Sequence, residues 1–144
     1  MSTVVSFYVL TQAAADARLR CACRLAEEAV EQGARVYLQT ATAADTRRLD
    51  DLLWTYSDGG FLPHEIYTGN PPDLDVVKVL LGEPPPPASH RDLLVNLTET
   101  LPTDLEQYAR IAEIVDVDPE RKRSARERYR QYRERGCGLE SINV

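Results

Sequence analysis

The sequence predicts an α/β protein, a single domain whose mostly parallel, Rossmann-like sheet is flanked by helices on both faces and ends in a basic helix. Three consecutive segments indicate this fold class. Residues 4–10 form an apolar, β-branched and aromatic run typical of a buried strand, residues 15–31 have helical periodicity, and residues 35–40 resume strand character. A strand, helix, strand unit normally gives two parallel strands joined by a right-handed crossover.

Length and composition indicate one domain and an ordinary globular class. The chain has 144 residues, of which 43% are hydrophobic and 28% charged, enough to build one core. We therefore expect one domain over residues 1–144. No early apolar run suits a signal peptide, and the sequence contains no apolar span of about 18 residues, so we expect a cytoplasmic protein that does not enter a membrane.

Two helices are expected in the first half of the chain. The first covers residues 15–31, and Gly33 is well placed to end it. The second covers residues 43–56, with Asp45 in its first turn, where a negative charge is favourable. The apolar faces of these helices consist of Leu19, Ala22, Cys23, Ala26 and Val30 in the first, and of Leu49, Leu52, Leu53 and Tyr56 in the second.

The second half of the chain completes the predicted sheet. Residues 76–81 and 92–97 read as strands, and we take the latter as the last buried strand, which gives about four strands in all. Asp104 can cap a helix running to about residue 115. Pro119 then suits the first turn of a final helix over residues 119–135.

The final helix has an unusual charge for this protein. It carries eight Lys or Arg against three Glu, although the whole chain has a net charge of −6. Lys122, Arg126, Tyr129 and Arg133 recur at helical spacing and line one stripe, while Ala125 and Tyr132 lie about 100° away and suit the core. Arginine binds carboxylates bidentately, so the stripe suits an acidic peptide that ends in an aromatic residue. The alternative is a solvated face that only aids solubility.

The sequence offers no cofactor, metal or catalytic site. The turn after the first strand reads TQAAADA and lacks the glycines of a phosphate-binding loop, and no GxxxxGK[ST] motif occurs. Cys21, Cys23 and Cys137 have neither zinc-site spacing nor a disulfide pattern, and His64 and His90 stand apart from any nucleophile setting. We therefore expect no cofactor, no metal and no enzymatic activity.

Two segments together resemble a known family. ARERYRQYRERG at residues 125–136 and LDDLLWTYSDGGFLPH at residues 49–64 are similar to the chi subunit of the bacterial DNA polymerase III holoenzyme, an accessory protein of the clamp loader. The resemblance also includes SFYVL, CRLAEEAVEQGARVYLQT, RDLLVNL and EIVDVDPE, and so extends over nearly the whole chain. No single piece is a fingerprint, but the order and spacing of the pieces are specific.

The resemblance implies a non-catalytic adaptor in DNA replication, acting in the cytoplasm at the replisome on the nucleoid. Chi proteins bind the acidic C-terminal tail of single-stranded DNA-binding protein at the basic helix. Carried over to this sequence, the tail site consists of Lys122, Arg126, Tyr129 and Val117, although Asp118 can occupy the place of Val117.

The resemblance implies a second partner, the psi subunit, which links chi to the clamp loader. The matching residues here are Trp54 and Phe61. From the residues alone both aromatics read as core side chains, and only the resemblance places them at a surface. Whether this surface also serves another protein, such as a repair helicase, stays open.

Direct binding of single-stranded nucleic acid is the alternative function. A basic helix with two tyrosines can contact phosphates and stack bases. The remaining 127 residues carry a net charge of −11, which repels a polyanion outside one narrow strip. The charge distribution therefore favours a peptide, and we expect little or no direct binding of nucleic acid.

Overall fold

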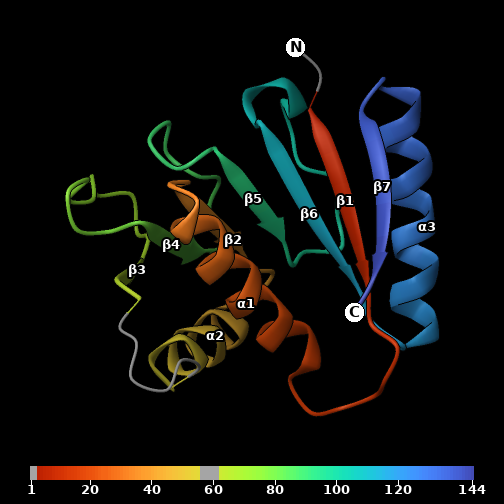
Figure 1. Ribbon diagram of the computed structural model, residues 1–144, viewed down its shortest axis with the longest axis horizontal. Helices are drawn as coiled ribbons and strands as arrows, with labels where there is room; N and C mark the ends of the chain where they lie inside the picture. The colour runs from red at the N-terminus through yellow and green to blue at the C-terminus, as the bar shows by residue number, and fades with distance from the viewer. Residues whose placement is uncertain (1–2, 56–61) are drawn as a thin grey trace.

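A computed structural model describes residues 3–55 and 62–144 and has the predicted α/β architecture (Figure 1). None of the helices in these two ranges is long and apolar enough to cross a membrane. The elements are, in chain order, β1 (Val4–Val9), α1 (Ala17–Glu31), β2 (Val36–Gln39), α2 (Ala43–Thr55), β3 (His64–Ile66), β4 (Val79–Gly82), β5 (Leu93–Asn96), the short 3-10 helix η1 (Leu105–Gln107), β6 (Arg110–Val115), α3 (Pro119–Glu134) and β7 (Gly138–Asn143).

The described strands form one seven-stranded sheet in the order β3-β4-β2-β5-β6-β1-β7. Every neighbouring pair is parallel, which confirms the predicted parallel sheet. The expected number of about four strands is wrong, because β3, β6 and β7 were not predicted. The first strand lies next to one edge of the sheet, since β1 pairs with β6 on one side and with the edge strand β7 on the other.

The predicted helix over residues 104–115 is wrong. Asp104 has a left-handed backbone (φ 51°) and makes no capping hydrogen bond from its side chain, and only η1 follows it. Residues 110–115 form β6, which pairs with both β1 and β5. Apolar residues at Leu105, Tyr108 and Ala112 imitate helical spacing, but the β-branched segment RIAEIV gains more from two neighbouring strands than from a lone helix.

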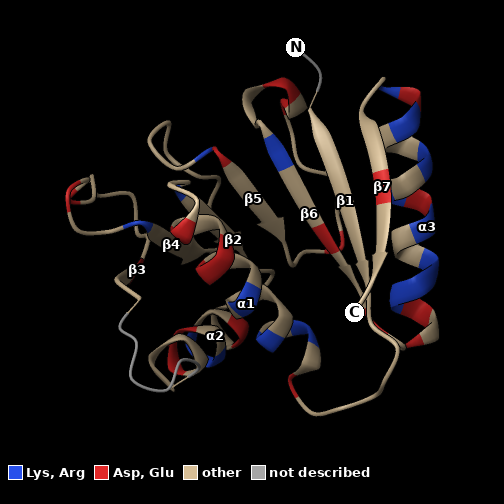
Figure 2. Ribbon diagram, in the orientation of Figure 1, with Lys and Arg blue, Asp and Glu red and all other residues tan. Residues whose placement is uncertain are grey.

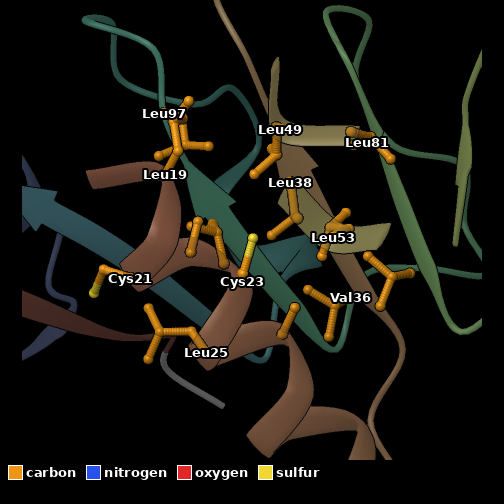
Figure 3. Packing of buried hydrophobic residues seen from close by; sticks show 14 of the residues in the cluster. Leu19, Cys21, Cys23, Leu25, Val36, Leu38, Leu49, Leu53, Leu81 and Leu97 are labelled. Atoms are coloured by element: carbon orange, nitrogen blue, oxygen red, sulfur yellow. The ribbon is translucent and has the colours of Figure 1, made fainter. Parts of the chain in front are cut away.

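Two cores cover the two faces of the sheet, as expected for helices on both sides. Side chains alternate along β2, so Val36 and Leu38 belong to one core and Tyr37 to the other. The first core packs α1 and α2 on the sheet through residues such as Leu19, Cys23, Leu38, Leu49 and Leu53 (Figure 3). Gly33, with φ 86°, follows the end of α1 as predicted.

The second core holds α3 against the opposite face. Pro119 occupies the first turn of α3, and the Asp118 side chain caps the helix by accepting a hydrogen bond from the backbone N–H of Arg121 at 3.0 Å. Ala125 and Tyr132 are buried, as the sequence predicted. The helix runs antiparallel to β6 and β7 and lies beside β7 in Figure 1.

His90 is buried as a neutral ring beside Val77, a residue of this second core. Its Nε2 donates to the carbonyl oxygen of Val77 at 2.9 Å, and its Nδ1 accepts from the hydroxyl of Ser89 at 2.8 Å. The imidazole is fully buried, and this burial lowers the pKa of His90.

The lowered pKa predicts a loss of stability in mild acid. The unfolded chain binds a proton at His90 near the ordinary value of about 6.5, before the folded chain does, so stability falls as pH falls through that value. We expect His90→Gln to reduce this slope by up to about 1.4 kcal/mol per pH unit. Urea unfolding of parent and variant between pH 7.5 and 5.5 measures it, and identical slopes would contradict the prediction.

Candidate functional site

A groove of about 380 Å³ lies between α3 and the strands β1, β6 and β7. Strand residues form its floor: Phe7 and Val9 from β1, Val115 from β6 and Ser141 from β7. Helix α3 supplies the wall: Lys122, Ala125, Arg126 and Tyr129. The groove therefore unites three of the four residues that the sequence predicts for the tail site. Figure 2 shows that Lys and Arg are concentrated along α3.

The apolar side of the groove is held rigid by ring contacts. Tyr129 is half-buried, and its ring centroid lies 5.2 Å from that of Phe7 with the planes tilted by 59°. Phe7 also meets the buried ring of Tyr132 edge-on, at 6.0 Å. Contacts of this kind stabilise a defined ring orientation. The groove therefore offers a preformed apolar surface beside the cations.

The two cations of the groove differ from most others on the helix. Arg121, Arg123, Arg128 and Arg130 each form an ion pair with a glutamate. Within the described part of the chain, neither Lys122 nor Arg126 has such a partner, and Arg126 is exposed at the groove. Their charges are available to an anionic ligand without first breaking an internal ion pair.

Val117 lies apart from the lining residues of the groove. It is half-buried in the connection between β6 and α3, where its N–H donates to Oδ1 of Asp116 at 2.7 Å. Val115, two residues earlier, lines the floor instead. Sequence reasoning missed Phe7 and Val9 because it did not show which strand face meets the helix. It missed Val115 because β6 was predicted as a helix, and Ser141 because β7 was not predicted.

A buried polar network attaches α3 to the sheet beside the groove. The carboxylate of Glu113 on β6 accepts hydrogen bonds from Arg128 Nε at 3.1 Å, from Tyr132 Oη at 2.6 Å and from Asn96 Nδ2 at 2.8 Å. All four side chains are buried. Nη1 of Arg128 also donates to the hydroxyl of Ser124, and it lies 3.6 Å from Oε2 of Glu99. The network fixes the rotation of α3 about its axis, and hence the direction of the adjacent Tyr129.

Burial and the hydrogen-bond partners of Glu113 shift its pKa in opposite directions. Burial raises the pKa of Glu113, while the charge of Arg128 and the three donors favour the ionised form. Burial and the neighbouring carboxylate raise the pKa of Tyr132, so its hydroxyl remains a donor. A buried charge is tolerated only when it is paired and hydrogen-bonded, and both oxygens of Glu113 meet this condition.

Trp54, the first residue expected at the second surface, lies at the C-terminal end of α2 with 57% of its area exposed. Its neighbours Leu52 and Leu53 are buried in the first core. The reading of Trp54 as a core residue is therefore wrong. Phe61 lies outside the described residues. Trp54 and the groove lie on different helices, on opposite faces of the sheet.

Comparison with known proteins gives one consistent result. The family described as DNA polymerase III chi subunit, HolC, matches residues 1–140. The chain is 41% identical to the DNA polymerase III subunit chi of Pseudomonas aeruginosa over 138 residues, which cover 96% of this chain and 94% of that protein. It is 30% identical to the subunit of the same name in Haemophilus influenzae, covering 100% of this chain and 99% of that protein. The chain belongs to the DNA polymerase III chi subunit family.

Membership in the chi family confirms the resemblance and implies a role in DNA replication as an accessory subunit of DNA polymerase III. Among solved structures, T4 UvsW superimposes with a TM-score of 0.64 at 8% identity. The superposition covers 99% of this chain but only 41% of UvsW, and it shows the α/β fold alone. In the described parts of this chi-family chain, no group of histidine, cysteine and carboxylate side chains is arranged to hold a metal ion.

The buried network yields a stability prediction. Glu113→Gln removes the charge that compensates Arg128 and places an amide donor among donors, so we expect a loss of about 3 to 5 kcal/mol in the free energy of unfolding. Glu120→Gln is the matched control: it removes an exposed partner of Arg123 on the same helix and should change stability by less than about 0.5 kcal/mol. Equal urea midpoints for the two variants would show that the network does not hold α3.

Proposed function

We propose that this chi-family chain is a non-catalytic adaptor that binds the acidic C-terminal tail of single-stranded DNA-binding protein in the groove beside α3. The observation that carries the proposal is the combination of unpaired Lys122 and Arg126 with the ring of Tyr129 in one groove. The guanidinium of Arg126 would hold the terminal carboxylate. Tyr129 and the aliphatic part of Lys122 would flank the last aromatic side chain.

The floor of the groove adds three residues to the proposed tail site. Phe7, Val9 and Val115 supply apolar surface on which an aromatic ring can be buried. An acidic tail without a terminal aromatic residue would use the cations but leave this floor exposed to water. We therefore include these three residues in the tail site, and place Val117 at its margin, where the connection between β6 and α3 begins.

The second part of the proposal is that Trp54, with Phe61, binds the psi subunit and so joins the chain to the clamp loader. Large aromatic side chains that stand exposed in the free protein are characteristic anchors of protein interfaces. The surface is separate from the groove, so the chain can hold both partners at once and tether the polymerase to coated DNA. Such linkage increases the effective concentration of each partner for the other.

Direct binding of single-stranded DNA is less well supported. Four arginines of α3 are paired with glutamates, and two of these glutamates, Glu120 and Glu127, place negative charge on the helix itself. A DNA backbone needs a continuous positive track. The groove instead offers two cations beside an apolar floor, which suits the end of a peptide.

Arg126→Ala tests the tail site. A charged hydrogen bond of this kind contributes roughly 1.5 to 3 kcal/mol, so we expect affinity for the tail to fall about ten- to a hundredfold. Arg126→Lys should restore only part of the loss, because an ammonium lacks the bidentate geometry. Calorimetric titration with a peptide ending in acidic residues and Phe measures the effect.

Arg130→Ala is the matched control, because it removes the same charge from the same helix at a residue that pairs with Glu127 and does not line the groove. It should leave tail affinity within about twofold of the parent. A parallel titration with a single-stranded oligonucleotide in the same salt separates the alternatives. Loss of oligonucleotide binding in Arg126→Ala, with tail affinity unchanged, would favour the nucleic-acid function.

Trp54→Ala tests the second surface. If Trp54 is an anchor, its loss should weaken binding to the psi subunit by about 2 kcal/mol or more and leave tail affinity unchanged. Because the residue is exposed, the variant should fold like the parent, which circular dichroism can verify. Unchanged affinity for psi in a folded variant would contradict the assignment.

A further inference from the structure

The exposed indole of Trp54 lies against a ring that is itself buried. The centroids of the Trp54 and His64 rings are 4.6 Å apart, with an interplanar angle of 60°. Trp54 is 57% exposed, whereas the side chain of His64 has no exposed area. His64 begins β3, the edge strand beside α2, so the contact joins a helix end to the edge of the sheet. The indole is therefore supported by the ring of His64, although more than half of the area of Trp54 is exposed.

His64 is held on both sides of its ring. Its Nδ1 lies 2.7 Å from the carbonyl oxygen of Leu62, a hydrogen-bond distance. Its Nε2 lies 3.1 Å from Oδ1 of Asp50, in the geometry of an ion-pair contact rather than an aligned hydrogen bond. The hydrogen bond to the chain before β3 and the nearby carboxylate on α2 leave the imidazole little freedom to rotate.

Asp50 and Trp54 belong to the same stripe of α2. They are four residues apart, so the helix brings their side chains to one face, and His64 lies between them. The carboxylate fixes the ring, and the ring supports the indole. The arrangement does not require burial of Trp54, which explains how an exposed tryptophan can have a defined orientation.

We propose that His64, held by Asp50, is a positioning residue that fixes the indole of Trp54 in the orientation in which it contacts a partner. The proposal rests on the proposed function of the Trp54 surface. Immobilising a large side chain before binding removes an entropic cost of about 0.5 to 1.5 kcal/mol that binding would otherwise include. Loss of His64 should therefore weaken the partner about twofold to tenfold without removing any direct contact.

The orientation of Trp54 can be measured in the isolated chain, because Trp54 is the only tryptophan in the sequence. We expect His64→Ala to raise the acrylamide quenching constant of tryptophan fluorescence and to lower its anisotropy, because the indole loses the ring that supports it. His64→Phe keeps a ring beneath the indole and should restore part of both signals. Asp50→Asn should produce a smaller change of the same sign, because the ring then loses its charged partner.

Asp51→Asn is the matched control, since Asp51 is exposed, lies one residue along the same helix and does not contact His64. It should leave both fluorescence signals unchanged. Asp50→Asn also keeps the test decisive if His64→Ala fails to fold. Unchanged quenching and anisotropy in folded His64→Ala or Asp50→Asn would overturn the proposal.

Affinity for the psi subunit separates this inference from the proposed function. A fluorescence change together with a twofold to tenfold weaker complex supports both. A fluorescence change with full affinity in His64→Ala, while Trp54→Ala binds weakly, overturns the positioning role. If neither variant weakens the complex although the fluorescence changes, His64 still positions Trp54, and it is the assignment of psi to this surface that fails.

Discussion

The carboxylate of Glu113 is the interaction on which the groove depends. It lies in the middle of a strand that is buried on both faces, and it receives donors from β5 and from two successive turns of α3. An apolar contact would permit α3 to slide or rotate at small cost, because hydrophobic association has no preferred direction. Hydrogen bonds to one buried carboxylate permit one geometry. The cations and the tyrosine ring of the groove have fixed places because Arg128 and Tyr132 have fixed places.

A second consequence of this network is that the arginines of α3 have different partners. Arg128 is used for attachment, and several other arginines pair with glutamates on the surface. What remains for a ligand is a small set of cations beside an apolar floor. The high charge of α3 therefore overstates the number of its cations that lack an internal partner.

The sequence predicts the basic stripe, the burial of Ala125 and Tyr132, the first two helices and the parallel sheet, since each depends on local periodicity or on one crossover unit. Prediction from the sequence fails where pairing between strands far apart in the chain determines the structure. The segment RIAEIV becomes a strand because β1 and β5 are available on its two sides, and no local pattern reveals them. Val115 rather than Val117 lines the groove because β6 ends at Val115 and Val117 lies in the connection that follows it. The exposure of Trp54 could not be read from helical spacing, because it lies at the edge of the apolar row.

The position of β1 between β6 and β7 sets an order of assembly. The floor of the groove cannot form until Val115 and Ser141, which come more than 100 residues after Phe7 and Val9, have been synthesised. The surface around Trp54 is formed by α2 and the strands β3 and β4, which lie close together in the sequence. During synthesis, which proceeds from the N-terminus, contacts close in sequence are available first and distant ones last. Under the proposed function, the segments around Trp54 are therefore synthesised before the last strand that completes the floor of the groove.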